Sequence, residues 1–168
     1  MNKPTLIGFA GSIMALVFMI YALLTLGWIP VALFVFFGLL AFQDLTTGRI
    51  NLVSFLPPGI LLIIFYWFDF LLIYVPVFGL LAGIWILLLA IKKTTKIDPE
   101  KLRYGFGDVL GLPYALTLSW ILIPFWGLVV FAGSQLGLMP WFLRKKQRRF
   151  LPWFLPGLII NFVLAVVL

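Results

Sequence analysis

Cysteine and histidine are absent from this chain of 168 residues, and charged residues make up only 10% of it. The absence of both side chains excludes disulfides, thiolate and imidazole metal ligands, a cysteine nucleophile and a Ser-His catalytic pair. We therefore expect neither a metal nor a cofactor. So few charged groups also leave too little polar surface for a soluble domain of this size, and the composition indicates a membrane protein.

Long apolar runs are what the chain has in abundance. Hydrophobic residues form 64% of it, and the mean hydropathy is +1.21. Runs long enough to cross a bilayer recur along the whole sequence, whereas the alternation of barrel strands is absent. The sequence predicts an all-α fold, a polytopic transmembrane helix bundle of about seven spans in one membrane-embedded domain, residues 1–168. We place the spans at about residues 6–26, 29–43, 52–68, 71–91, 106–122, 124–143 and 151–168.

Basic residues lie between these runs in a regular pattern. If the chain crosses the bilayer at each run, all 12 Lys and Arg residues fall on one side. The positive-inside rule puts that side, and with it the N-terminus, in the cytoplasm of a multi-pass protein of the cell membrane. The net charge of +7 is explained by short loops that meet anionic headgroups, so we expect membrane lipids as partners and no nucleic acid.

Two acidic residues lie where a membrane chain disfavours them. Asp44 ends the second run and Asp108 begins the fifth, so the predicted topology puts both at the cytoplasmic face. A carboxylate beside hydrocarbon is costly and indicates function. The helix macrodipole opposes Asp44 by roughly 0.3–1 kcal/mol, whereas Asp108 has an alternative explanation as a helix N-cap. Gly105 and Gly107 allow backbone to come close to Asp108 and to an extended peptide.

A pair of aspartates that shares one water can hydrolyse a peptide bond. The ionised carboxylate takes a proton from the water, and the protonated carboxyl hydrogen-bonds the scissile carbonyl and later gives a proton to the leaving amine. Such a pair titrates in two coupled steps, because like charges at close range cannot both ionise easily. The helix dipoles favour Asp108 as the base and Asp44 as the acid, while the nearby Arg49 favours the reverse assignment.

The two motifs resemble those of the type IV prepilin peptidases and preflagellin (archaellin) peptidases, which are membrane aspartyl proteases of the GxGD type. Residues 105–108, Gly-Phe-Gly-Asp, match the second-aspartate motif of that family, and residues 44–51 resemble the first. A basic stretch followed by residues 150–156 resembles the start of the family's last helix, so the resemblance covers roughly residues 30–168. Two positions depart from the pattern: Leu110 stands where many members have Lys, and Asn51 comes without the preceding Pro.

The resemblance implies that Asp44 and Asp108 form the catalytic pair of a six-helix core, with the first span as an N-terminal addition. It implies an endopeptidase that removes the short basic leader from prepilin-like or archaellin precursors at the cytoplasmic membrane face. N-methylation of the cut pilin is not expected, because the archaeal branch lacks it. Four further residues are candidate substrate contacts: Arg49, Asn51, Asp98 and Glu100. Of these, Asp98 and Glu100 are the candidates for docking the basic leader.

A non-enzymatic membrane protein is the alternative, such as a small transporter or an assembly scaffold whose acids bind protons or cations. A transporter more often places its acids near the bilayer midplane and contains inverted repeats. In this sequence both acids are expected at one face, and we find no repeat. A presenilin-like intramembrane protease is a third hypothesis, although its other aspartate is expected deep in a helix.

Several other residues have structural interpretations. Asp69 is expected alone in an outer turn, and Trp120 is interpreted as an interfacial anchor. Asn161 is expected to hydrogen-bond a neighbouring helix, and residues 57–59 and Pro113 predict kinks. Small residues of the sixth span predict close packing there: Gly127, Ala132, Gly133 and Gly137.

Overall fold

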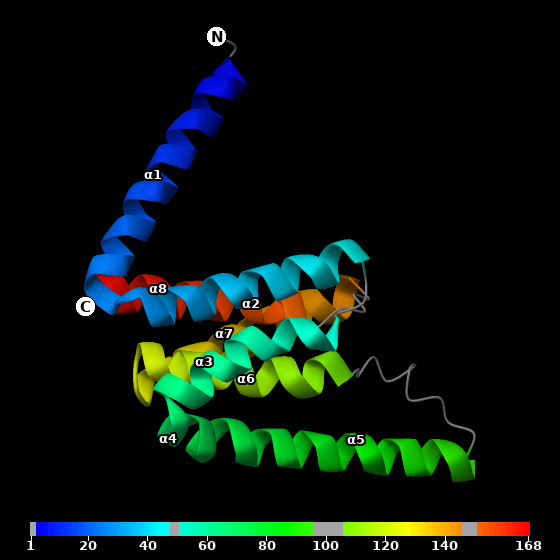
Figure 1. The fold of residues 1–168 in the computed structure, drawn as a ribbon. Helices are drawn as coiled ribbons and strands as arrows, with labels where there is room; N and C mark the ends of the chain where they lie inside the picture. Colours follow the sequence, from blue (N-terminus) through cyan, green and yellow to red (C-terminus); the bar gives the residue numbers. More distant parts are fainter. Residues whose placement is uncertain (1–2, 48–50, 96–105, 146–150) are drawn as a thin grey trace.

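The computed structural model of the chain is helical in nearly all of the residues that it describes, 3–47, 51–95, 106–145 and 151–168 (Figure 1). Side chains are described at residues 12, 14–47, 51–90, 109–138 and 154–168. No strand occurs in the described ranges, so the predicted all-α fold is confirmed. The elements are α1 (Lys3–Leu26), α2 (Trp28–Thr47), η1 (Leu52–Phe55), α3 (Leu56–Phe65), α4 (Trp67–Asp69), η2 (Phe70–Tyr74), α5 (Val75–Thr95), α6 (Phe106–Leu122), α7 (Trp126–Lys145) and α8 (Leu151–Val167).

The helix boundaries follow the predicted spans closely and depart from them at one connection. α6 coincides with the predicted span 106–122. The predicted span 52–68 extends too far, because α3 ends at Phe65 and the helical segment α4–η2–α5 begins at Trp67. The physical reason is Tyr66, whose backbone angles, φ −132° and ψ 40°, lie outside the helical region.

Residues 57–59 lie in the first turn of α3, directly after a 3-10 turn, so the interruption predicted at the start of this span coincides with a change of helix type. Pro57 and Pro58 lie in the first turn of α3, where an N–H group has no helical partner to lose. The 3-10 turn η1 precedes them, and the side chain of Asn51 caps this turn by accepting the N–H of Val53 at 3.1 Å. Pro113, by contrast, lies inside α6.

From α2 onward the long helices lie side by side, and each runs opposite to the one before it (Figure 1). The last turns of α2, α5 and α7 and the first turns of η1, α6 and α8 therefore meet at one end, which we call the Asp44 end. The opposite end, which contains α4, is the Asp69 end. The helices that flank residues 48–50, 96–105 and 146–150 all terminate at the Asp44 end, as the alternating charge pattern predicts.

α1 departs from this arrangement. Only its C-terminal part packs on the bundle, where Ala22 is buried and Phe18 and Leu26 are half-buried, and the remainder projects away (Figure 1). Gly27 has φ +79°, a left-handed conformation that glycine adopts without the penalty of a Cβ, and it permits the sharp turn into α2. The predicted run 6–26 is helical, within α1, and in this conformation most of α1 does not lie alongside the other helices.

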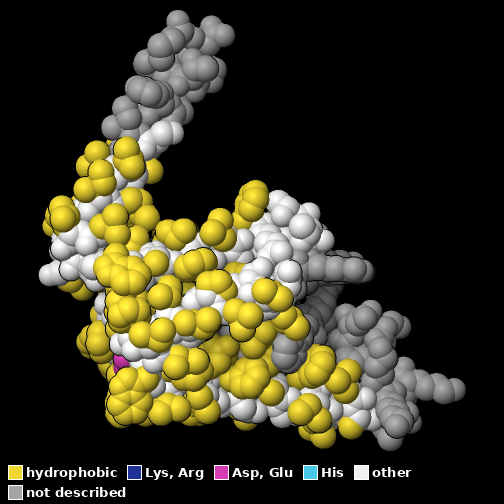
Figure 2. All heavy atoms as spheres, in the orientation of Figure 1, with side chains coloured by type: hydrophobic (Ala, Val, Ile, Leu, Met, Phe, Trp, Pro, Cys, Tyr) yellow, Lys and Arg dark blue, Asp and Glu magenta, His cyan; other side chains and the backbone are white. Residues whose placement is uncertain are grey.

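The exterior of the bundle is largely apolar (Figure 2). Among the described residues, two helical segments are long and apolar enough to cross a membrane, Trp28–Thr47 and Trp67–Ala90, and the latter has 0% of its most apolar stretch buried. Further apolar helices, such as Val109–Leu122, are shorter. An exposed apolar surface of this extent is typical of contact with lipid or with another protein.

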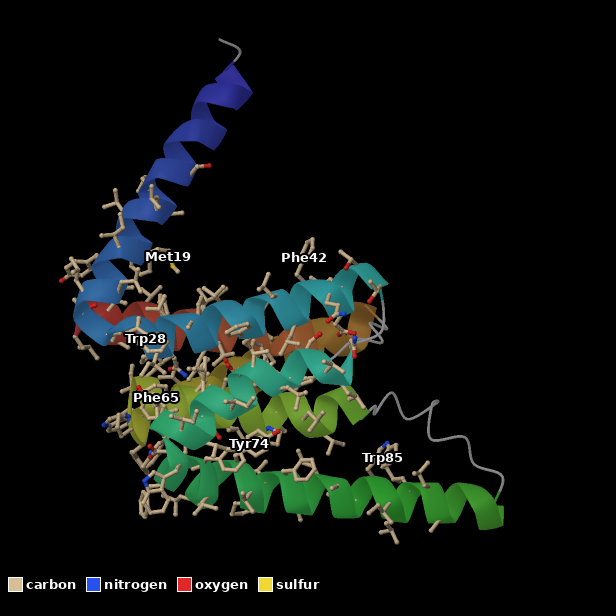
Figure 3. All side chains as sticks on the ribbon, viewed as in Figure 1. Met19, Trp28, Phe42, Phe65, Tyr74 and Trp85 are labelled. Carbon is tan, nitrogen blue, oxygen red and sulfur yellow. The ribbon has the colours of Figure 1, made fainter. Side chains whose placement is uncertain are left out.

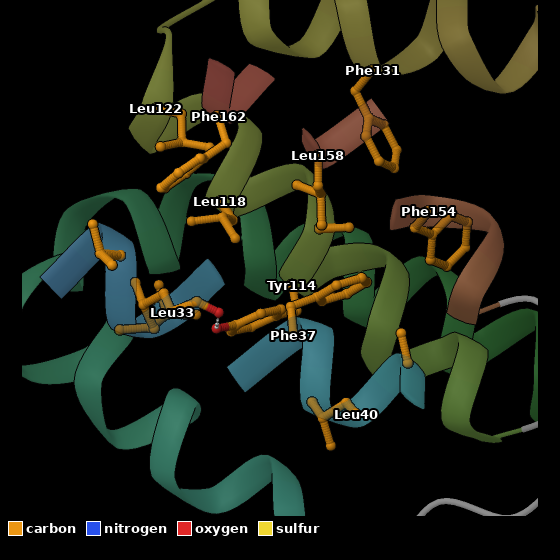
Figure 4. Packing of buried hydrophobic residues seen from close by; sticks show 14 of the residues in the cluster. Leu33, Phe37, Leu40, Tyr114, Leu118, Leu122, Phe131, Phe154, Leu158 and Phe162 are labelled. Atoms are coloured by element: carbon orange, nitrogen blue, oxygen red, sulfur yellow. Dashed lines mark hydrogen bonds between the residues drawn. The ribbon is translucent and has the colours of Figure 1, made fainter. Parts of the chain in front are cut away.

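α6 lies at the centre of the bundle, and its described side chains, from Val109 to Leu122, are buried or half-buried. At the Asp69 end the ring of Trp28 from α2 meets that of Phe65 from α3 edge to face, with centroids 5.5 Å apart (Figure 3). Nearer the centre, a cluster of large side chains from α2, α6, α7 and α8 forms the core (Figure 4). Its principal members are Leu33, Phe37, Tyr114, Leu118, Phe131, Leu158 and Phe162.

Candidate active site

Asp44 lies in the last turn of α2, on the face that packs against the bundle. Leu33, Phe37, Leu40 and Ala41 are buried on the same face, and their spacing of three or four residues makes one continuous stripe. Only 8% of Asp44 is exposed. Burial of a carboxylate is costly unless the charge is compensated or neutralised. The helix thus carries an acid where its apolar pattern alone would place an aliphatic side chain.

α2 continues past Asp44 to Thr47, so Asp44 is not the terminal residue that its place after the apolar run predicts. The hydroxyl of Thr46 donates to the carbonyl of Phe42 at 2.9 Å, and that of Thr47 donates to the carbonyl of Gln43 at 2.8 Å. Each bond runs from a hydroxyl back to the carbonyl four residues earlier, so both stay within the last turns of α2. Asp44 remains within the turn where the macrodipole opposes a negative charge.

Asp108 lies in the first turn of α6, two residues after the helix begins at Phe106. It is therefore part of the helix, and the alternative explanation of Asp108 as the N-cap is wrong. The side chain of Asp108 is outside the described side chains, and Gly105 is outside the described residues. Gly107 belongs to the first turn of α6.

The register of α2 and α6 places the two aspartates at the same height. The helices are neighbours and run in opposite directions (Figure 1), and the ring of Tyr114 in α6 stacks on that of Phe37 in α2 with centroids 5.6 Å apart. Asp44 follows Phe37 by seven residues, and Asp108 precedes Tyr114 by six. At about 1.5 Å per residue, both aspartate backbones lie roughly 10 Å from the stacked rings, toward the same end of the bundle.

The remaining candidate residues of this site are mostly beyond the described ranges. Arg49, Asp98 and Glu100 lie outside the described residues, so their substrate contacts stay predictions. Asn51 is exposed and caps η1 through the N–H of Val53. The cap explains why an asparagine suits this position locally, and its predicted contact with a substrate stays a prediction.

The Asp69 end holds an acid in a different environment. Asp69 is half-buried, and its Oδ1 accepts the indole N–H of Trp120 at 2.9 Å. Asp69 lies in the short helix α4 and not in the expected turn, and Trp120 is more than an interfacial anchor, because the bond ties α4 to the end of α6. Tyr66 lies in the connection before α4, and its pKa is raised above the ordinary value of 10.0. Burial is the larger cause, and the negative charge of Asp69 is the second.

Asn161 makes the predicted hydrogen bond to a neighbouring helix. Its Nδ2 donates to the carbonyl of Gly127 at 2.8 Å, which joins α8 to α7. Gly127 also approaches α6 so closely that a Cβ would overlap the carbonyl oxygen of Ser119, so the close packing predicted for Gly127 is confirmed. The other small residues of α7 are exposed, and the close packing predicted for them is wrong: Ala132, Gly133 and Gly137.

Tyr114 is an organising residue that the sequence analysis did not single out. Its hydroxyl donates to the carbonyl of Leu33 at 2.7 Å, across the interface between α6 and α2. A signal was present in the sequence, since a tyrosine in the middle of an apolar run needs a hydrogen-bond partner when it is buried. The partner itself could not be predicted, because it is a backbone group in a distant helix.

Comparisons with known proteins do not assign the chain to a family. No family model, no curated protein and no solved structure gives a significant match to it. The resemblance to membrane aspartyl proteases therefore depends on the motifs around Asp44 and Asp108.

Proposed function

We propose that this protein is a polytopic membrane aspartyl endopeptidase that removes the short basic leader from prepilin-like or archaellin precursors. The observation that carries the proposal is the burial of Asp44 on the bundle face of α2, at the height of Asp108 in the neighbouring α6. An acid held against both burial and the helix macrodipole is typical of a functional site. The sequence motifs around the two aspartates support the same chemistry.

Hydrolysis by such a pair needs only the two carboxyl groups and one water. The ionised carboxylate accepts a proton from the water as the water oxygen attacks the scissile carbonyl carbon, and the protonated carboxyl donates a hydrogen bond to the carbonyl oxygen. The carbon–nitrogen bond then breaks, and the amine leaves with a proton from the acid. The helix dipoles favour Asp108 as the base, since it lies at the N-terminus of α6 and Asp44 lies near the C-terminus of α2.

We place the bundle in the cytoplasmic membrane of a prokaryotic cell, with the Asp44 end at the cytoplasmic face. α6 and α5 contain 17 and 21 residues, or about 25 and 31 Å of helix, close to the roughly 30 Å of a hydrocarbon core. The apolar exterior supports this placement, and so does the position at one end of the helix ends that adjoin the basic segments. α1 becomes the first span, with a cytoplasmic N-terminus, if it swings about Gly27 into line with the bundle.

The test is incubation of the purified, lipid-reconstituted protein with prepilin-like and archaellin precursors, followed by mapping of the new N-terminus. We expect cleavage between the basic leader and the apolar helix. Asp44→Asn and Asp108→Asn preserve side-chain shape and remove the titrating group, so each should abolish cleavage while helicity and membrane insertion persist. Cleavage that survives in either variant rules out the pair. Proton or cation flux that depends on Asp44, without cleavage, would favour the transporter hypothesis.

A further inference from the structure

Tyr114 links α6 to α2 through two contacts. Its side chain is 1% exposed, its hydroxyl donates to the carbonyl of Leu33 at 2.7 Å, and its ring stacks on Phe37 with an interplanar angle of 2° (Figure 4). Leu33 and Phe37 are one helical turn apart on the buried face of α2. A single side chain therefore holds two points of the helix that carries Asp44.

The two contacts restrict different movements of α2. A slide of α2 along α6 would leave the hydroxyl of Tyr114 without its acceptor, which is costly in an apolar interior. Rotation of α2 about its axis would withdraw Phe37 from the face of the tyrosine ring and lose the stacking. Together the contacts define both the height and the rotation of α2 relative to α6.

Pro113 makes this link more important for the turn that carries Asp108. Proline has no N–H, so the carbonyl of Val109 loses its helical partner, and α6 bends more easily there. The hydroxyl of Thr117 donates to the carbonyl of Pro113 at 2.8 Å, a bond that stays within α6. Tyr114 directly follows the weakened turn and anchors it to α2.

From this geometry we infer that Tyr114 is a positioning residue: it holds α2 and α6 in the register at which Asp44 and Asp108 share one water. The inference rests on the proposed peptidase function. Tyr114 acts through the two helices, since its ring lies roughly 10 Å along the bundle from the aspartate backbones. A displacement of about 1 Å at a reacting centre can lower a rate about a hundredfold, so a looser remote contact is enough to slow the chemistry.

The test is Tyr114→Phe, which keeps the ring and its stacking and deletes only the hydroxyl. We expect kcat to fall about tenfold while KM is unchanged. We also expect the acid and alkaline limbs of the pH dependence of kcat to move toward each other, because aspartates that lie farther apart repel less and their apparent pKa values converge. A merely structural role would reduce the amount of active enzyme without moving either limb.

Thr117→Val is the matched control. It also removes a buried hydroxyl that donates to a backbone carbonyl of the same bundle, but that bond lies within one helix. We expect kcat and both limbs of the pH dependence to stay as in the unmodified protein. Equal effects of the two substitutions, or no effect of Tyr114→Phe on kcat and on the limbs, would overturn the inference and leave the peptidase function standing.

A distance measurement tests the register without any substrate. The chain has no cysteine, so spin labels can be attached at Phe42→Cys in α2, which is exposed and points away from the bundle (Figure 3), and at Leu110→Cys in α6. Tyr114→Phe should broaden the distribution of label distances, and Thr117→Val should not. Unchanged distances in Tyr114→Phe would overturn the inference, whereas absence of precursor cleavage by the unmodified protein would overturn the proposed function.

Discussion

The two ends of the bundle each contain an aspartate near α6, in contrasting environments. At the Asp69 end, Asp69 is half-buried and accepts a hydrogen bond of 2.9 Å from the indole of Trp120. At the Asp44 end, Asp44 is only 8% exposed and lies in the last turn of α2, at the height where α6 begins. One aspartate thus makes a partly solvated contact, and the other lies on the buried face of a helix.

The two environments suggest different reasons for an acid at each end. The bond from Trp120 compensates the carboxylate of Asp69 and ties α4 to α6, so stability is a sufficient reason for that residue. Asp44 combines burial with an unfavourable position in the helix dipole, and both effects oppose a charge. A buried acid near the C-terminus of α2, beside a second acid at matched height, is what the proposed peptidase chemistry requires.

The largest expected effect comes from making the same substitution at both ends. Asp44→Asn removes a titrating group of the proposed pair and should abolish leader cleavage, since general acid–base catalysis by one positioned group contributes about a hundred- to ten-thousandfold to a rate. Asp69→Asn retains an amide oxygen that can accept the indole N–H of Trp120, so cleavage should be unchanged. The measurement is the initial rate of precursor cleavage by equal amounts of folded protein. Equal losses at both ends would remove the distinction between them.

A second effect concerns stability at the Asp69 end. Gly127→Ala places a Cβ against the carbonyl oxygen of Ser119 and disturbs the bond from Asn161 to Gly127. We expect the free energy of unfolding to fall by about 1–3 kcal/mol. Gly133→Ala is the control in the same helix, since its Cβ would meet open space, and it should raise stability by about 0.5–1 kcal/mol. Unfolding in mixed micelles measures both, and a neutral Gly127→Ala would contradict the close approach of α7 to α6.

Much of the fold could be predicted, because apolar runs and charge alternation are averaged over many residues. Span 106–122 matches α6 residue for residue, and the helix ends next to basic segments gather at one end. The break expected at residues 69–70 lies at Tyr66 instead, and its exact position could not be predicted, since no glycine or proline marks it. The direction of α1 could not be predicted either, because an apolar run does not specify which helices it packs against.

For the candidate site, the two motifs identify the residues, and the helix directions bring them to one end. The burial of Asp44 depends on which face of α2 packs inward, and the register depends on Tyr114 and Leu33, which are 81 positions apart. Contacts at that separation leave no periodic signal in a single sequence. The same reason hid the bond between Asp69 and Trp120, whose partners come from different helices.

The smallest expected effect is an ionisation shift in the connection before α4. Burial is the larger cause of the raised pKa of Tyr66, and the charge of Asp69 is the second. Asp69→Asn removes only the charge, so the pKa of Tyr66 should move part of the way down toward 10.0, with the part caused by burial retained. Absorbance titration of the phenolate, taken as the difference from a Tyr66→Phe variant, isolates this group from the other tyrosines. Asp69→Asn would then leave cleavage intact and lower the pKa of Tyr66. An unchanged pKa of Tyr66 would contradict the contribution of the charge of Asp69.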